Sequence, residues 1–308
     1  MRKHFLLWAF LGLTLIGCDS INPAPSTIDR QVVVESYQIA SEPLAPVRLS
    51  YTLDVNEVYE VGAQAVRNAS VTVYELTEAR DTVATYAYVE VDNGRYIAPD
   101  PNILVKPGTR YALRANVEGA QISAETFVPG DFVQVTAGPD SVFYQDIEPY
   151  ASNVTRSFTP ARQSAYVFSV EAMVIDTAAL TPFYKASLGD DPSEKDLEEA
   201  LERFALVSSP IVNEGNYEEN ADGSITIRLP WFAIAFYGSN KITTTAIDEN
   251  LYDYFRSSAV QQGGTTLSPG EIPNVLENVE GGIGFFGSMT RLADTVYVKR
   301  PIIDFSFN

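Results

Sequence analysis

Few side chains in this sequence could carry out catalysis, and their types exclude several reaction classes. The 308 residues contain one histidine, His4, and one cysteine, Cys18. Beyond position 18 the sequence therefore offers no histidine for a catalytic triad or a general base, and no cysteine nucleophile. A structural zinc site is excluded as well, because its ligands are mostly cysteine and histidine. Catalysis would have to use carboxylates, lysine, tyrosine or a hard metal ion held by oxygen atoms.

Pairs of carboxylates are the remaining candidates for acid and base chemistry. Asp190 with Asp191, or Glu218 with Asp222, could act in glycoside hydrolysis if their carboxyl groups lay about 5–10 Å apart across a cleft. The chain holds 40 acidic residues, so neighbouring carboxylates are expected by chance. We therefore expect no enzyme and no catalytic residues. A carboxylate-dependent, glycosidase-like hydrolase at the cell surface is kept as the alternative.

The stretch EENADG at 218–223 imitates the first half of an EF-hand calcium loop. The twelfth position of such a loop needs a bidentate glutamate, and here it is Leu229. The stretch favours instead a β-hairpin with Asp222-Gly223 in its turn. A calcium site of another kind among the carboxylates stays open, and the sequence identifies no cofactor and no metal site.

The sequence GIGFFG at 282–287 matches the G-x-G-x-x-G fingerprint of dinucleotide-binding sites. That fingerprint must lie between a strand and a helix of a βαβ unit. Here residues 290–298 return quickly to a strand pattern, so we expect no bound nucleotide. The glycines favour a tight bend where the backbone approaches a neighbour, with Phe285 and Phe286 filling a core.

The N-terminus carries a signal for export. Arg2 and Lys3 precede a mostly apolar run at 5–16, which is shorter than the roughly 20 residues needed to span a bilayer. The tetrad LIGC, which ends at Cys18, resembles the lipobox of bacterial lipoproteins, in which the cysteine receives a diacylglyceryl group. We expect residues 1–17 to be a lipoprotein signal peptide, Cys18 to be lipidated, and residues 18–30 to form a flexible tether.

The charge balance argues against nucleic acid as a partner. The chain has 21 basic and 40 acidic residues, and its net charge is −19. Binding along a nucleic acid needs clustered lysine and arginine to meet the phosphates. So acidic a composition suits a salty habitat, where screening weakens self-repulsion, and equally an ordinary lipoprotein surface.

Short strands separated by turns dominate residues 31–128. Stretches rich in valine, threonine and tyrosine predict strands at 32–34, 47–53, 70–76, 82–91, 110–117 and 121–128. Asn93-Gly94 and Pro107-Gly108 supply turn residues between them. Six or seven short strands in about 100 residues indicate an immunoglobulin-like β-sandwich. We place its boundary at residues 128–131.

A second β-rich domain with two short helices is expected at 131–308. Strands are predicted at 132–136, 165–175, 224–229, 242–247, 295–299 and 302–307. One helix should have Asp191 as its cap and Pro192 as its first residue. The other should run over 249–262 and begin after Asp248 as cap.

The densest group of aromatic residues lies in RLPWFAIAFYG at 228–238. Trp231 and Phe232, with Phe236 and Tyr237, are interpreted as core of the second domain, because large aromatic side chains are mostly buried. A groove for a ligand is the alternative interpretation, since exposed aromatic residues mark binding surfaces.

The C-terminal motif P-x-x-x-x-N-V-E-G-G-x-G-x-F-G begins at Pro273, and a helix with LYDYF at 251–255 precedes it. With the lipobox and the turn-rich sandwich, this order resembles the Bacteroidota lipoprotein family called domain of unknown function 4249. The matching positions are Pro273, Asn278, Val279, Glu280, Gly281, Gly282, Gly284, Phe286 and Gly287. The resemblance covers nearly the whole chain after the lipobox and implies a structural motif. Members are similar to outer-membrane lipoproteins found beside TonB-dependent transporters, and no catalytic residues come with the family.

These observations together predict a lipid-anchored protein of the outer membrane that acts by binding, as an accessory to a TonB-dependent-type transporter. Which face of the membrane it occupies is not fixed by the sequence. Besides the hydrolase, the alternative is a structural or adhesive surface lipoprotein. A deep cleft with two facing carboxylates would favour the hydrolase, and a broad apolar or aromatic patch would favour the accessory role.

Overall fold

The computed structural model describes residues 30–53, 58, 60, 62–136, 138–144, 150–189, 191–259 and 275–301. By its internal contacts the chain divides after Arg30, and residues 31–308 form one compact unit. The expected signal peptide, Cys18 and the tether up to residue 29 lie outside the described residues. So do Pro273 of the family motif and the strand expected at 302–307.

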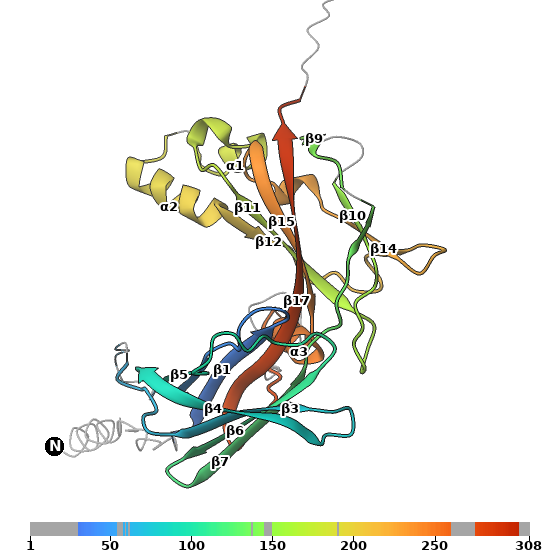
Figure 1. Ribbon diagram of the computed structural model, residues 1–308. Coiled ribbons are helices and arrows are strands. Elements are labelled where there is room, and N and C mark those ends of the chain that lie inside the picture. Colours follow the sequence, from blue (N-terminus) through green and yellow to red (C-terminus); the bar gives the residue numbers. More distant parts are fainter. Residues whose placement is uncertain are drawn as a thin grey trace, which may run out of the picture. The chain divides into compact units, whose positions relative to one another are not determined.

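The fold is mainly β, as expected, with 46% of residues in strands and 13% in helices. The first half contains β1 (Val32–Ile39), β2 (Val47–Tyr51), β3 (Ser70–Leu76), β4 (Thr82–Asp92), β5 (Arg95–Ile97), β6 (Arg110–Val117) and β7 (Ala120–Phe127) (Figure 1). All six strands expected here are confirmed, and the short β5, which completes a hairpin with β4, was not expected. Side chains along β1 alternate between buried and exposed, as a strand with one face on a core requires.

Two sheet layers enclose the first core. Strands β1, β2 and β5 belong to one layer, strands β3, β6 and β7 to the other, and β4 pairs with β3 along most of its length and with β5 at its end. Val34 and Leu49 from the first layer pack in one cluster with Val73, Leu113 and Ile122 from the second. Each such side chain contributes about 1.5–3 kcal/mol when fully buried. The arrangement is a β-sandwich held by apolar packing.

The second half adds β8 (Gln134–Thr136), β9 (Ser141–Phe143), β10 (Ala151–Val154), β11 (Ala165–Ala172), β12 (Leu206–Ser208), β13 (Glu218–Glu219), β14 (Ile225–Arg228), β15 (Gly238–Ile247), β16 (Val279–Glu280) and β17 (Ile283–Lys299). Strands β12, β11, β15 and β17 lie side by side in that order, and β13, β14, β10 and β8 form a separate sheet. Tyr166, Phe168, Ile225 and Ile227 are fully buried in the core that these strands share.

The long strand β17 connects the two halves. Its first residues pair in parallel with β1, from Val33 with Ile283 to Ile39 with Met289. Its later residues pair antiparallel with β15, up to Gly238 with Val298. The sheet therefore continues from strands of the first half to strands of the second, and the domain boundary at 128–131 stays a prediction.

Three α-helices occur in the described part of the chain, α1 (Pro182–Ala186), α2 (Glu194–Phe204) and α3 (Glu249–Ala259), with 3-10 turns η1 (Thr177–Ala179) and η2 (Trp231–Ala233). The cap of α3 is confirmed, because Asp248 Oδ1 accepts from Leu251 N at 2.9 Å. The expected cap of α2 was wrong. Ser193 takes that place, since its hydroxyl accepts from Asp196 N, so Asp191 and Pro192 lie before the helix.

The short helix α1 was not expected. Among the residues that the structure describes, no helix is long and apolar enough to cross a bilayer.

Candidate functional site

The family motif forms the entry into β17. Val279 and Glu280 make up β16 and pair with Ala124 and Ser123 of β7, and Gly281 and Gly282 follow as a bend. Phe286 is fully buried in the core of the sandwich.

Two positions of the motif, 284 and 287, show why glycine is needed there. Gly284 has φ +101°, and a Cβ at this position would lie 2.2 Å from the carbonyl oxygen of Val34. At Gly287 a Cβ would lie 2.6 Å from Cγ of Leu251 in α3. Glycine thus permits the parallel approach of β17 to β1 and the packing of α3 on β17. The G-x-G-x-x-G pattern at 282–287 lies in β17 from its second residue on, whereas a dinucleotide fingerprint leads into a helix.

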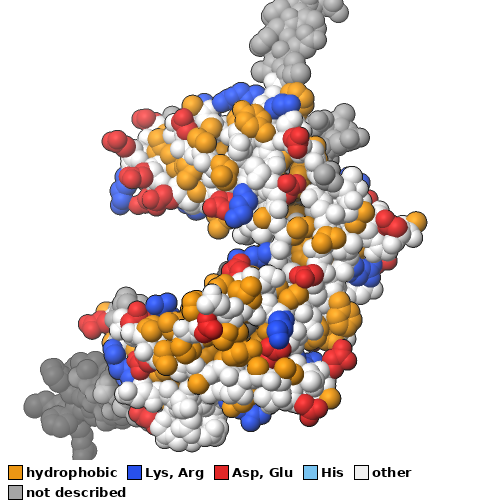
Figure 2. Space-filling view, in the orientation of Figure 1, with side chains coloured by type: hydrophobic (Ala, Val, Ile, Leu, Met, Phe, Trp, Pro, Cys, Tyr) orange, Lys and Arg blue, Asp and Glu red, His pale blue; other side chains and the backbone are white. Residues whose placement is uncertain are grey.

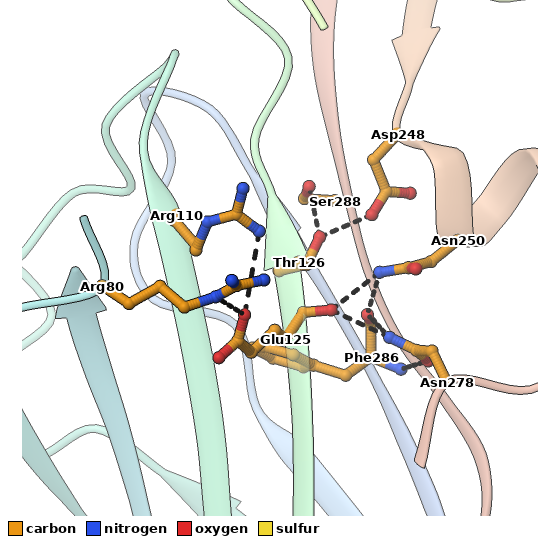
Figure 3. Close-up of polar contacts among 9 residues, drawn as sticks. All are labelled: Arg80, Arg110, Glu125, Thr126, Asp248, Asn250, Asn278, Phe286 and Ser288. Carbon is orange, nitrogen blue, oxygen red and sulfur yellow. Dashed lines mark hydrogen bonds and ion pairs between the residues drawn. The ribbon is translucent and has the colours of Figure 1, made fainter. Parts of the chain in front are cut away.

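Two asparagine side chains connect the first residues of β17 to β7 by hydrogen bonds. Asn278 Nδ2 donates to the carbonyl oxygens of Glu125 at 3.0 Å and Phe286 at 2.8 Å, and its Oδ1 accepts from Phe286 N at 2.9 Å. Asn250, at the start of α3, donates to the same two carbonyls at 2.8 and 3.2 Å (Figure 3). Strands β7 and β17 and helix α3 therefore share one hydrogen-bond network.

A buried carboxyl group lies beside that network. Asp248 is 2% exposed, and burial raises its pKa to about 6, against the hydrogen bonds it accepts, which lower it. Thr126 Oγ1 donates to Asp248 Oδ2 at 2.5 Å and lies 2.6 Å from the hydroxyl of Ser288. With Leu251 N on the other oxygen, both carboxyl oxygens are occupied in positioning α3.

A groove crosses the outer face of β6 and β7 next to these residues. Its middle is a cavity of about 300 Å³ between β7, the start of α3 and residues 159–161. A cavity of about 640 Å³ shares Arg80 and Glu125 with it, and one of about 560 Å³ shares Arg110, Phe127 and Pro160. The middle cavity is therefore adjacent to the other two, with which it shares wall residues. We call them the β6–β7 groove.

Alternation along two paired strands places the polar side chains of the groove. Arg110 and Arg114 of β6 and Glu125 and Phe127 of β7 point to the outer face, because residues two apart share a face. Arg110 lies directly opposite Phe127 in the register. Arg80 reaches the groove from the turn between β3 and β4, where its φ of +67° is one that L-residues rarely adopt.

Two guanidinium groups meet one carboxylate at the centre of the groove. Arg80 Nε lies 3.0 Å and Arg110 Nη1 3.8 Å from the same Oε2 of Glu125. Arg110 Nε is buried without a hydrogen-bond partner among the described residues. The guanidinium of Arg110 also lies 5.8 Å from the centre of the Phe127 ring, which Phe158 meets edge-on. Such a centre can hold a carboxylate or phosphate against an aromatic wall.

The carboxylate pair suggested at 218–222 has another role. Arg228 holds both carboxylate oxygens of Glu218 at 3.1 Å and lowers the pKa of that residue. Hydrogen bonds from Ser224 lower the pKa of Asp222, in the turn of the hairpin β13–β14. A general acid of a glycosidase needs a raised pKa, so this pair is unsuited to that role. The hairpin interpretation is confirmed.

Asp190 lies outside the described residues. Among those that the structure describes, no group of three His, Cys, Asp or Glu side chains could hold a metal ion.

The aromatic segment at 231–237 is divided between core and surface. Phe236 is fully buried and Tyr237 nearly so, which confirms the core interpretation for this pair. Trp231 and Phe232 are 38% and 48% exposed, so the interpretation was wrong for them. The reason is local, because η2 turns the chain at Trp231–Ala233 before it enters β15.

Sequence reasoning missed the arginines of the groove and Phe158. Arginine in an alternating strand is typical of a solvated face, and nothing local relates Arg80 to Glu125, 45 residues away. The one local peculiarity is the positive φ at Arg80, and arginine is not a residue type for which a positive φ is expected.

Similar folds among solved structures are distant. They include trypsin-activated alpha-2-macroglobulin from Escherichia coli, with 11% identity, TM-score 0.22 and coverage of 87% of this chain and 15% of that chain. A tetra-tandem repeat of a large adhesion protein has 14% identity, TM-score 0.20 and coverage of 87% and 49%. The chain thus spans half or less of the length of these structures. No curated protein matches the sequence.

A family model decides the classification. It is described as Domain of unknown function (DUF4249), and it matches residues 19–294, which include every described element except the end of β17. The motif residues that lock β17 to β1, β7 and α3 lie within that match. The chain belongs to the DUF4249 family.

Proposed function

We propose that this protein is a lipid-anchored protein of the cell envelope that acts by binding, as an accessory to an outer-membrane transporter of the TonB-dependent type. The β6–β7 groove is the binding site in this proposal. The lipobox-like tetrad ending at Cys18 supports the anchor, and the acidic, histidine-poor composition supports binding over catalysis.

The observation that carries the proposal is the pair of arginines on one carboxylate in the wall of the middle cavity. Glu125 can neutralise only one of the guanidinium groups of Arg80 and Arg110, which share its Oε2. The second positive charge is then available to an incoming anion. The Arg110 side chain is 22% exposed, so a ligand in the groove can reach it while bulk water is largely excluded.

The lining of the groove suits an extended ligand with charges of both signs, because acidic residues line it beside the arginines. The amide group of Gln121 offers hydrogen bonds, and the hydroxyl of Ser123, which donates to Glu280 Oε2, can still accept one. Phe158 is 59% exposed and adds an apolar contact near Pro160. Charges of both signs, amides and one aromatic wall together suit a peptide, whose backbone and side chains present the same kinds of group.

Titration with short peptides tests the groove. An acetylated alanine hexapeptide with one central glutamate should bind, and the glutamine version should bind at least about tenfold more weakly, since a charge-assisted hydrogen bond contributes about 1.5–3 kcal/mol. Arg110→Gln should cause a similar loss. Arg67→Gln is the matched control, because Arg67 contacts Asn93 outside the groove. Equal binding of both peptides would contradict the groove as the site.

Purification of the native protein from its own membrane tests the anchor and the transporter. We expect a lipid-modified N-terminal peptide at Cys18 and a transporter that co-purifies. The variant Cys18→Ala should appear in the soluble fraction after export. Recovery of unmodified Cys18, or of the protein without a transporter under mild extraction, would count against the proposal.

One observation favours the alternative of a carboxylate-dependent hydrolase. Asp248 lines the groove and has a raised pKa, as a general acid does. Both of its oxygens are engaged in hydrogen bonds that position α3, so a structural role accounts for the residue. Turnover of a glycoside or peptide by the native protein, lost in Asp248→Asn, would establish the alternative instead.

A further inference from the structure

A second surface, far from the groove in the sequence, exposes large aromatic side chains. Phe183 of α1 is 50% exposed, and Trp231 and Phe232 of η2 are 38% and 48% exposed. Lys185 lies in the last turn of α1, and Arg300 directly follows β17, both with exposed side chains. We call these five residues the aromatic–basic surface. Exposed aromatic residues grouped in this way mark an interaction site.

The exposed rings are held in fixed positions. Trp231 meets Phe183 edge-on at 5.8 Å between ring centres and Tyr144 at 5.7 Å, and Tyr144 meets Tyr237 at 5.6 Å. Tyr144 and Tyr237 are buried, so the exposed ring of Trp231 packs on aromatic rings of the core. The hydroxyl of Tyr184 donates to the carbonyl of Phe232 at 3.1 Å. Little side-chain entropy would be lost when this surface binds.

Two basic residues, Lys185 and Arg300, belong to this surface in a chain that is otherwise acidic. Arg300 donates to the carbonyl of Ala178, and its guanidinium lies 4.5 Å from the centre of the Tyr237 ring. Figure 2 shows Lys and Arg beside hydrophobic side chains at the end of the view where α1 and the end of β17 lie in Figure 1.

The acidic side chains of η1 and α2, which neighbour this surface, form a hydrogen bond or are exposed away from the buried face of α2. The carboxylate of Asp176 accepts from Ala178 N at the start of η1. Helix α2, which packs Phe204 against Tyr184, buries Ala200 and Phe204. Its acidic residues are exposed on the other faces of the helix, at Glu194, Asp196, Glu198, Glu199 and Glu202. In the part of the chain that the structure describes, the ion pairs involve neither Lys185 nor Arg300.

We infer that the aromatic–basic surface docks against a lipid bilayer with anionic head groups. Aromatic rings favour the boundary between head groups and acyl chains, and long cationic side chains reach from there to the phosphates. Each Lys or Arg near an anionic surface contributes about 1 kcal/mol. A net charge of −19 repels the rest of the protein from such a surface, so the charge pattern selects this side for contact. The site is separate from the N-terminal lipid of the proposed function.

Trp231 reports on this contact directly. The chain has two tryptophans, and Trp8 lies in the expected signal peptide, so a protein that starts at Ser20 contains Trp231 alone and keeps the whole unit 31–308. It also lacks Cys18 and thus any lipid. Vesicles with about one third phosphatidylglycerol should shift the Trp231 emission to shorter wavelength and sediment the protein. Phosphatidylcholine vesicles should do so at least about tenfold more weakly, and added salt should weaken binding.

Variants separate the rings from the charges. Phe183→Ser should weaken vesicle binding at least about fivefold, since burying a phenylalanine contributes about 1.5–3 kcal/mol. Lys185→Glu combined with Arg300→Glu should weaken it about tenfold or more and remove the salt dependence. Tyr37→Ser is the control, because Tyr37 is 46% exposed on β1 outside this surface. Unchanged urea midpoints establish that the variants are folded.

Three results would overturn the inference. The first is no vesicle binding by the native sequence, and the second is binding that survives both the ring and the charge variants. The third is a protein partner whose co-purification requires Phe183 while vesicle binding does not. A membrane contact that fails in this way leaves the peptide titration of the groove unaffected, so the two proposals can be judged separately.

Discussion

Gly284 allows two parallel strands to approach at a point where any other residue would meet backbone. Its φ is +101°, and a Cβ added there would lie 2.2 Å from the carbonyl oxygen of Val34, so two requirements for glycine act together. Gly108 has φ +64° and nothing within 4 Å of the corresponding Cβ position, so it carries the conformational requirement alone. A comparison of Gly284 with Gly108 therefore separates the cost of the positive φ from the cost of the collision with backbone.

Gly284→Ala should therefore lower the free energy of unfolding by about 3 kcal/mol or more, and Gly108→Ala by about 1 kcal/mol. Positive φ costs about 1–2 kcal/mol in both variants, and the backbone collision adds to it only at Gly284. Urea unfolding followed by circular dichroism measures both. Equal losses would show that β1 and β17 can separate at no cost.

Asp248 should make stability depend on pH. Burial raises its pKa from 3.8 to about 6, so the folded protein holds the proton more tightly than the unfolded chain does. This contribution is fully present below about pH 4 and is lost as pH rises through 6, up to about 3 kcal/mol at 1.36 kcal/mol per pKa unit.

The variant Asp248→Asn removes this titration and keeps an acceptor for Leu251 N. Urea unfolding at pH 4.5, 6 and 7.5 should show the native sequence losing stability relative to the variant as pH rises, by about 1–3 kcal/mol. All other carboxylates are common to both proteins and cancel in the difference. Parallel pH profiles would mean that Asp248 is not perturbed.

At the scale of elements, the two asparagines decide how α3, β7 and β17 are joined. Asn278 and Asn250 donate to the same carbonyls of Glu125 and Phe286, so each can substitute in part for the other. Asn278 alone also accepts from Phe286 N. The single change at Asn278 therefore leaves one buried N–H without a partner, and the double change leaves two carbonyls unsatisfied as well.

Asn278→Ala should cost about 2–3 kcal/mol, and Asn250→Ala about 1 kcal/mol. The double variant should cost more than the sum of the two, with a coupling of about 1 kcal/mol. Asn102→Ala is the control, since that side chain bonds only within an exposed turn to Asp100, and it should cost at most about 0.5 kcal/mol. Additive losses would show that the two side chains act independently.

Elements with strong local signals were predicted well. The strands at 70–76 and 110–117 have the bounds expected from alternation and β-branched content. The cap of α3 follows from one aspartate before a helical stripe. The cap of α2 was placed two residues early, because Asp191, Pro192 and Ser193 all carry starting signals and only the backbone decides among them.

At the scale of the whole molecule, β17 decides the architecture. The sequence at 290–298 predicts a strand. It does not predict that β17 pairs with β15 on one part and, on another, with β1, whose residues are about 250 positions away. Such pairings depend on which apolar faces meet. The entropic cost of closing a loop grows only slowly with its length, so it discriminates little among distant partners. The parallel pairing explains the motif glycines, which the sequence alone could only assign to a close backbone approach.

The β class, the strand positions, the family motif and the residue types available for chemistry all followed from the order of the amino acids, because alternation and turn residues act over a few neighbours. The convergence of side chains from distant segments, Arg80 with Arg110 on Glu125 and Trp231 with Phe183, emerged only in three dimensions. These contacts arise from strand register and long-range packing, which a local sequence pattern does not encode.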